Sequence, residues 1–96
     1  MPANIRLSTD KSTGHGCWPP TLPAMASTNV YVNGRREVRK GDAYVAHCCP
    51  SKGCHVGTAG ANITKTYANG RLVHTVGAPI TCGDTASGGS PNTFSG

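Results

Sequence analysis

A short Asn-Gly motif occurs twice in the sequence, and this repeat constrains the fold more than any other feature. Residues 28–34 (TNVYVNG) align with residues 64–70 (TKTYANG) at an offset of 36 residues. Asn-Gly between alternating side chains favours a type I′ β-hairpin, because both central residues of that turn need positive φ. We therefore expect hairpins at about 28–40 and 64–76.

The C-terminal segment resembles a third, partial copy of the same unit. Residues 90–96 (SPNTFSG) contribute a single expected strand at about 91–95. No stretch keeps a 3.6-residue hydrophobic period, so no α-helix is predicted. Three similar units can wrap around an axis and present three similar faces. The sequence thus predicts one all-β domain over 1–96, built of short β-hairpins with pseudo-threefold symmetry.

The composition limits how such a domain can be stabilised. The 96 residues include 13 glycines and 7 prolines, and aromatic residues make up only 5%. Burial of apolar surface alone rarely stabilises so small and glycine-rich a chain, so a cross-link by disulfides or a metal is expected. No apolar run follows Met1–Arg6, so we expect no signal peptide and synthesis in the cytoplasm. Disulfides are unlikely there, and the five cysteines do not pair evenly, which favours a metal.

Three histidines and one late cysteine form the candidate metal site. They are His15, His47, His55 and Cys82, and they come from the start, middle and end of the chain. Three imidazoles and one thiolate complete a tetrahedral shell for zinc and leave no open position. The predicted site therefore joins distant parts of the chain. Two neighbouring thiols, those of Cys48 and Cys54, are rival ligands.

Other residues near these motifs are assigned structural roles. Cys17 is expected to pack beside the site, and Trp18 to act as an apolar plug over the small core. His74, in the strand expected after the second Asn-Gly turn, is expected to face solvent or a partner.

Taken in order, these motifs resemble the PAAR-repeat proteins, which cap the spikes of contractile phage tails and type VI secretion systems. The resemblance covers roughly residues 8–96 and departs from the family pattern at Gly77-Ala78-Pro79 and at Thr93. The segments that carry it are Asp10, Gly14-His15-Gly16-Cys17-Trp18-Pro19-Pro20, Val30-Tyr31-Val32-Asn33-Gly34, Gly41-Asp42, His47, His55, Cys82-Gly83 and Gly88-Gly89-Ser90-Pro91-Asn92.

The resemblance implies a small cone-shaped fold whose broad base sits on the blunt end of a trimeric β-helical spike, one copy per trimer. It implies a zinc site near the apex, with the family's ligands carried over onto His15, His47, His55 and Cys82. The expected function is that of a structural tip protein that sharpens the spike for membrane piercing and contacts the target's outer membrane transiently. Neither enzymatic activity nor a small-molecule substrate is expected. Such a protein is made in the cytoplasm and assembled into the virion tail tip or secreted with the spike.

Two other classes of function agree less well with the sequence. The net charge of +5 and the cluster Arg35–Lys40 are compatible with a small zinc-binding domain that recognises nucleic acid. That function is the alternative, and it is less favoured because a recognition helix and stacking aromatic residues are both missing from the sequence pattern. A hydrolase using metal-bound water needs an open coordination position, which the four-ligand set does not leave.

Overall fold

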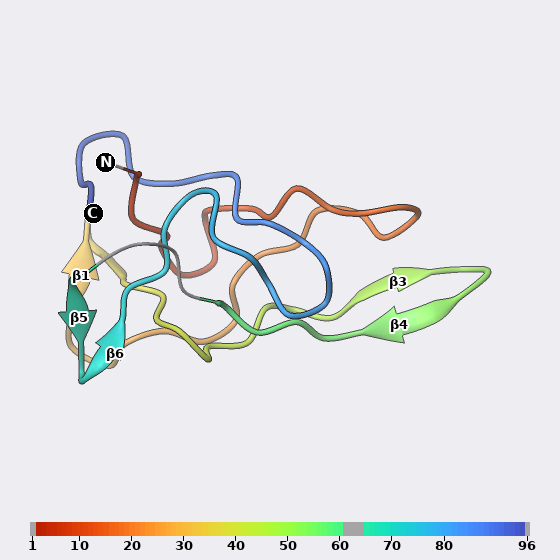
Figure 1. The fold of residues 1–96 in the computed structure, drawn as a ribbon, viewed down its shortest axis with the longest axis horizontal. Helices are drawn as coiled ribbons and strands as arrows, with labels where there is room; N and C mark the ends of the chain where they lie inside the picture. The colour runs from red at the N-terminus through yellow and green to blue at the C-terminus, as the bar shows by residue number, and fades with distance from the viewer. Residues whose placement is uncertain (1, 61–64, 96) are drawn as a thin grey trace.

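In the computed structural model, short strands and irregular segments wind around one long axis (Figure 1). The structure describes residues 2–60 and 65–95, with principal extents of 38 × 23 × 22 Å. Over these residues the chain forms no helix, and hence none long and apolar enough to cross a membrane. The all-β prediction is therefore confirmed for the described part of the chain.

Both Asn-Gly motifs form the predicted hairpins. β1 (Tyr31–Val32) pairs with β2 (Arg35–Arg36), and β5 (Tyr67–Ala68) pairs with β6 (Arg71–Leu72), each pair antiparallel. In both turns asparagine has positive φ (53° and 54°), and the following glycine has a φ of 77°. The ladders are shorter than the predicted spans, since each joins only two residue pairs, and residue 64 lies outside the described residues.

A third hairpin lies outside the segments for which the sequence predicts hairpins. β3 (His47–Cys49) pairs with β4 (Gly53–His55) in an antiparallel register that sets His47 opposite His55. This hairpin projects at the right-hand end in Figure 1, away from β1, β5 and β6. We call the end formed by β3 and β4 the β3–β4 end, and the opposite end, with β1, β2, β5 and β6, the hairpin end.

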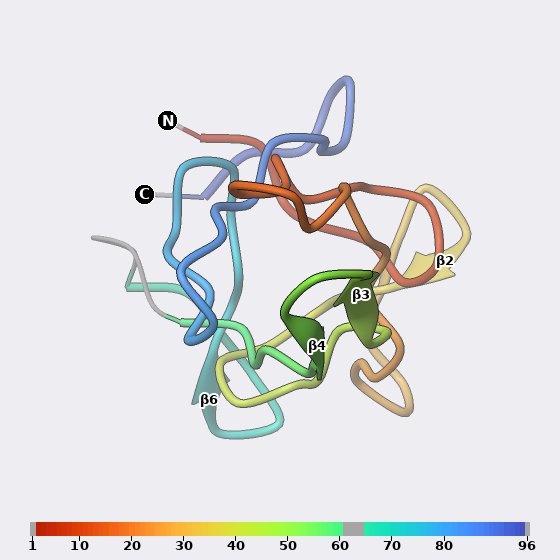
Figure 2. The same ribbon diagram turned by 90° about the vertical axis from the view of Figure 1, so that its right-hand side faces the viewer.

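Three chain segments close into a ring between these two ends. The amide of Val38 donates to the carbonyl of Ile5 (3.0 Å), the amide of His74 to Val38 (2.9 Å), and the amide of Ile5 to His74 (3.0 Å). Because each segment pairs with the next, and the third with the first, the ring has pseudo-threefold symmetry. Figure 2, viewed along the long axis, shows the chain arranged around this centre.

The C-terminal segment occupies the third position of the repeat, as predicted. The hydroxyl of Ser90 accepts a hydrogen bond from the amide of Thr93 (3.0 Å), as that of Ser27 does from Val30 (2.9 Å). Pairing in this segment is a single bridge between Phe94 and Ala3 rather than the strand expected at about 91–95.

The core contains one histidine that the sequence analysis placed wrongly. His74 is fully buried, whereas we expected it to face solvent or a partner. Its two ring nitrogens lie 2.9 Å from the carbonyl oxygen of Gly60 and 3.0 Å from the hydroxyl of Tyr44, and burial lowers its pKa to about 4. Around it lies an apolar cluster of Ile5, Val38, Tyr44, Ala59, Ile80 and Ala86.

Four of the five cysteines form disulfides, so the expectation that disulfides are unlikely is wrong. Cys17 is bonded to Cys49, and Cys48 to Cys54, while Cys82 remains free. The register of β3 and β4 explains the second bond, since it sets Cys48 directly opposite Cys54. The two rival thiols are thereby removed as candidate metal ligands.

Every acidic side chain of the protein is buried. Asp10 and Asp42 accept paired hydrogen bonds from the guanidinium groups of Arg6 and Arg39, at 2.8–3.0 Å. These two pairs occupy equivalent positions in successive units and satisfy the buried charges. The remaining acidic residues, Glu37 and Asp84, are buried without an arginine or lysine partner among the described ion pairs.

Candidate metal centre

All four predicted ligands meet at one place in the structure. The donor atoms of His15, His47, His55 and Cys82 lie within 4.8 Å of one another. They gather where the β3–β4 hairpin leaves the body of the protein, so the site lies toward the β3–β4 end. One residue of the set is buried and three are half-buried.

Two of the ligands are cross-strand neighbours. His47 begins β3 and His55 ends β4, and their direct pairing puts both imidazoles on the same face of the hairpin. Their Nε2 atoms are 2.6 Å apart. The hairpin thus supplies half of the donor set from adjacent positions.

The hydrogen bonding of His47 determines which nitrogen is available. Its Nδ1 lies 2.7 Å from the carbonyl oxygen of Pro19, and a carbonyl can only accept, so Nδ1 carries the proton and donates. The lone pair is then on Nε2, which faces His55 and lies 3.8 Å from the sulfur of Cys82. A backbone carbonyl on the second nitrogen is a common partner of a metal-binding histidine.

His15 is held by a tight turn. The backbones of His15 and Trp18 exchange two hydrogen bonds, of 3.0 and 2.9 Å. The turn requires Gly14, which has a φ of +74° and where a Cβ would lie 2.9 Å from the carbonyl oxygen of Trp18. Both ring nitrogens of His15 are buried without a hydrogen-bond partner. Such unsatisfied donors and acceptors are costly, and a bound metal ion would satisfy one of them.

Cys82 reaches the site because its neighbour lacks a side chain. A Cβ on Gly57 would lie 2.6 Å from the sulfur of Cys82 and 2.5 Å from Cγ2 of Ile80. Glycine at this position therefore permits the close approach of the thiol, a role that sequence analysis did not identify.

Trp18 covers the imidazoles rather than the apolar core, which corrects its predicted position. Its ring stacks on His55 with centroids 4.5 Å apart and on His15 at 5.1 Å. The indole N–H donates to the carbonyl of Gly53 at 3.0 Å. Beside it, Cys17 is exposed and bonded to Cys49. The indole therefore shields one side of the donor set from water.

The electrostatics favour a neutral imidazole at His55 and an ionised carboxylate at Asp84. Partial desolvation, together with repulsion from His47 and His15, lowers the pKa of His55. Burial alone would raise the pKa of Asp84, but hydrogen bonds from Ser12, Thr13 and the backbone outweigh it and hold that pKa below its ordinary value. The Asp84 carboxylate lies 3.8 Å from Nδ1 of His15, where it can orient the ring.

This donor set fits a metal ion. Tetrahedral zinc with its ordinary bond lengths separates two ligand nitrogens by about 3.3 Å and a nitrogen from a sulfur by about 3.6 Å. The observed 2.6 Å and 3.8 Å lie on either side of these values, within reach of small side-chain movements. The four residues can therefore hold one ion, and imidazole with thiolate suits zinc or iron.

A scan against protein-family models and a search of curated proteins found no match to this chain.

Proposed function

We propose that this protein is a structural tip that caps a trimeric β-helical spike of a contractile phage tail or type VI secretion system. The observation that carries the proposal is the closed ring of Ile5, Val38 and His74. Through this ring a single chain acquires three similar strand segments around one axis. A trimeric β-helix ends in three unpaired strand edges, and a monomer of this symmetry can extend all three at once.

Exposed aromatic side chains at the hairpin end support this docking mode. Tyr31, Tyr67 and Phe94 occupy equivalent positions of the three units and are 58%, 63% and 48% exposed. Three such residues form a repeated apolar contact set, and aromatic residues are enriched at protein interfaces. A threefold partner would meet the same side chain three times.

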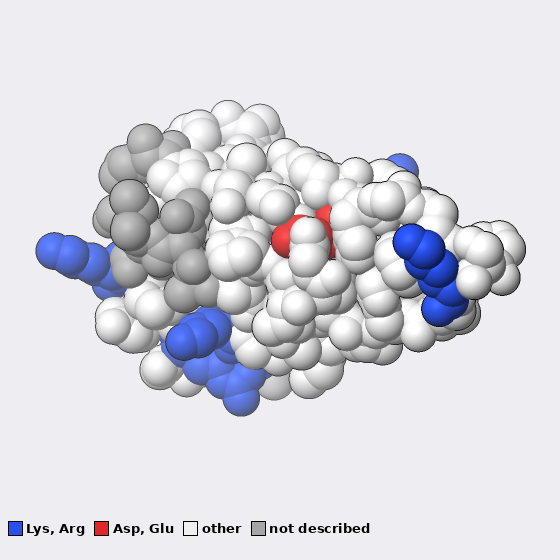
Figure 3. Space-filling view, turned by 45° about the vertical axis from the view of Figure 1, so that its right-hand side comes forward, with Lys and Arg blue, Asp and Glu red and all other residues white. Residues whose placement is uncertain are grey.

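The charge distribution indicates the chemistry of the partner. All four acidic residues are buried, whereas Lys11, Arg35, Arg36, Lys40, Lys52, Lys65 and Arg71 are exposed. In Figure 3 the Lys and Arg side chains protrude from the surface, while acidic atoms are visible only in a small recessed area.

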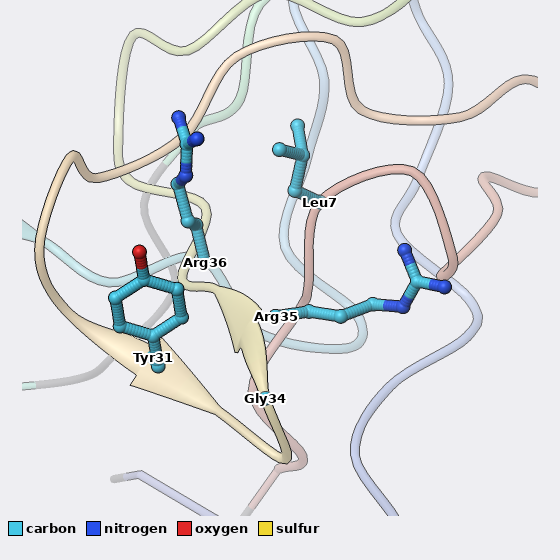
Figure 4. A pocket seen from close by; sticks show the side chains of 5 residues that line it. All are labelled: Leu7, Tyr31, Gly34, Arg35 and Arg36. Carbon is cyan, nitrogen blue, oxygen red and sulfur yellow. The ribbon is translucent and has the colours of Figure 1, made fainter.

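A pocket of about 250 Å³ at the hairpin end combines cationic and aromatic groups. It is lined by Leu7, Tyr31, Gly34, Arg35 and Arg36 (Figure 4). Arginine and tyrosine side chains that line one pocket fit a partner that presents carboxylates, and we assign those carboxylates to the end of the spike.

At the other end we propose that zinc is held by His15, His47, His55 and Cys82. A closed four-ligand site can add about 10 kcal/mol or more to folding free energy. The bound ion would supply cross-linking without an open position for a reaction. The four side chains join three separate loops, so they would keep this narrow end rigid as it contacts the target's outer membrane.

The test is the stoichiometry and affinity of a complex with the trimeric spike protein made alongside this chain. Mass photometry or sedimentation is expected to give one copy per trimer. Tyr31→Ala and Tyr67→Ala are each expected to weaken binding at least about tenfold. Val56→Ala, an exposed apolar residue next to β4, is the matched control and should bind normally. Any other stoichiometry, or equal binding by all variants, contradicts the proposal.

The exposed charged side chains are all cationic. This favours a second candidate function, that of a zinc-binding domain that binds nucleic acid. Non-specific binding has dissociation constants of about 10⁻⁴–10⁻⁶ M at physiological salt. Two results would support this candidate. Duplex DNA or single-stranded RNA should bind about 100-fold more tightly than this non-specific range, and the double variant Arg35→Ala with Arg36→Ala should bind more weakly. Binding only in the non-specific range would reject it.

A further inference from the structure

The two disulfides lie in the sequence and in space around three of the four metal ligands. Cys17 is two residues from His15, and Cys49 is two residues from His47. We infer that both disulfides are positioning elements of the metal centre, so that the oxidised chain binds the ion more tightly than the reduced chain. The inference rests on the proposed metal centre and adds a redox requirement to it.

The first disulfide fixes His15 relative to the β3–β4 hairpin. Among the described residues, the turn that carries His15 contacts that hairpin through ring stacking and through the indole N–H bond to Gly53. The Cys17–Cys49 bond adds a covalent link between the turn and β3. Without it, His15 would be held near His47 by non-covalent contacts alone, which also include the hydrogen bond from the His47 ring to the carbonyl of Pro19 just after the turn.

The second disulfide fixes His47 relative to His55. Cys48 and Cys54 are opposite each other in the register, one step from the His47–His55 pair. The β3–β4 ladder has only three residue pairs, and a two-stranded sheet of that size is marginally stable in water. The disulfide therefore keeps the strands paired and the two imidazoles side by side.

Cys82 completes a division of roles among the five cysteines. Its thiol is the one that is not oxidised, and it faces the imidazole nitrogens. Oxidation of the other four removes thiols that would compete for the ion and leaves one sulfur in the donor set. Ligands held in place by covalent bonds lose less freedom on binding, which raises affinity.

The redox step balances with a small disulfide oxidant. Each pair of cysteine thiols gives up two electrons and two protons to one molecule of oxidised glutathione, which becomes two molecules of reduced glutathione. Forming Cys17–Cys49 and Cys48–Cys54 thus consumes two molecules of oxidant. The Cys82 thiol is unchanged and can lose its proton to the ion it binds.

The experiment compares zinc affinity among oxidised wild type and paired variants, by competition with a chromophoric chelator. The variants are Cys48→Ala with Cys54→Ala, Cys17→Ala with Cys49→Ala, and all four changes together. Positioning groups around metal ligands change affinity by about 10- to 100-fold, and we expect such a loss in each paired variant. Cys48 and Cys54 are exposed, so their replacement leaves no buried cavity.

Two further measurements separate positioning from loss of fold. Amide resonances of the two Asn-Gly turns should be unchanged in every variant, because those hairpins are distant from the disulfides. A phosphine reductant should lower the zinc affinity of wild type by about 10- to 100-fold. The same reductant should have no effect on the fourfold variant, which has only Cys82.

Equal zinc affinity in wild type and all three variants would overturn the inference while leaving a zinc-stapled tip in place. No zinc binding by the oxidised wild type would instead overturn the metal centre itself, and with it this inference. Failure of the spike complex alone would reject the proposed function without affecting either result.

Discussion

At the scale of single residues, the candidate metal centre depends on neighbours that supply no donor atom. Gly14 allows the turn that holds His15, and Gly57 leaves room for Cys82. The carbonyl of Pro19 sets the tautomer of His47. The geometry of the site is therefore determined as much by backbone and small residues as by its ligands.

Gly57→Ala tests this dependence directly. The added methyl group would meet the sulfur of Cys82 and the side chain of Ile80, so we expect a loss of about 1–3 kcal/mol in stability and weaker zinc binding. Thermal unfolding with and without zinc, together with chelator competition, measures both effects. Gly34→Ala is the control, because no atom lies near its Cβ position and its cost comes from backbone strain in the β1–β2 turn. If both variants bind zinc equally well, Gly57 has no role at the site.

That His15, His47, His55 and Cys82 lie together was predictable from the sequence, because histidine and cysteine are zinc-ligand types and because the motifs around these four resemble a known family. The disulfides were not, because their pairing depends on the register of β3 and β4 and on where the His15 turn folds back. Trp18 was assigned to the core because an indole is apolar, whereas its stacking on His55 requires the folded arrangement.

At the scale of secondary-structure elements, turn chemistry explains which hairpins were predicted. Asn33 and Asn69 adopt the positive φ that the Asn-Gly motif implies, so a local signal was sufficient. The β3–β4 hairpin was missed although its turn also carries a signal. Pro50 sits at the first central position of a turn closed by the Lys52 amide, which donates to the Cys49 carbonyl (3.0 Å), and Gly53 follows with a φ of 91°. Proline at that position and a glycine after the turn are both turn signals.

Asn69 is expected to stabilise its hairpin in two separable ways. Its φ of 54° is unfavourable for alanine, and its side-chain amide donates to the Asn29 side-chain oxygen at 2.8 Å. Asn69→Gly removes only the hydrogen bonds, whereas Asn69→Ala removes them and adds about 1–2 kcal/mol of strain. Urea unfolding should therefore rank wild type above Asn69→Gly and Asn69→Gly above Asn69→Ala. An alanine variant at least as stable as the glycine variant would contradict the type I′ turn.

At the scale of the whole molecule, the offset of the repeat predicted the threefold arrangement, but not the residues that break it. Aligning the units sets His74 at the position of Val38, inside the ring, and this alignment was the available signal for its burial. Strand alternation alone did not reveal it. Glu37 is a second polar residue on an inward position, where it accepts a hydrogen bond from Asn4 at 2.5 Å.

Glu37 makes the stability of the fold depend on pH. Burial raises its pKa to about 8, above the ordinary value of 4.5, so the folded state holds this proton more tightly than the unfolded state. Its contribution is therefore fully present below pH 4.5 and is lost as pH rises toward 8. Glu37→Gln should remove this loss and stabilise the protein relative to wild type by on the order of 3 kcal/mol at pH 7.

Urea titrations of wild type and Glu37→Gln at several pH values between 4 and 8 measure this effect. The difference in unfolding free energy should be small at pH 4 and should grow in favour of Glu37→Gln up to pH 8. His74 has the opposite effect on stability. Because its pKa is lowered to about 4 in the folded state, the protein loses stability as the pH falls below 6.5. Because both proteins retain His74, its effect cancels in the difference. A constant difference across this range would show that Glu37 is not a buried titrating group.

The most direct test of the account is the metal content of the protein purified without added metal, in wild type, His15→Ala and Cys82→Ala. These residues belong to the first and last loops that meet at the site. The account predicts close to one zinc ion per chain in wild type and little or none in either variant. One zinc ion that survives both substitutions would place the metal within the β3–β4 hairpin alone and would contradict a site that joins the two ends of the chain.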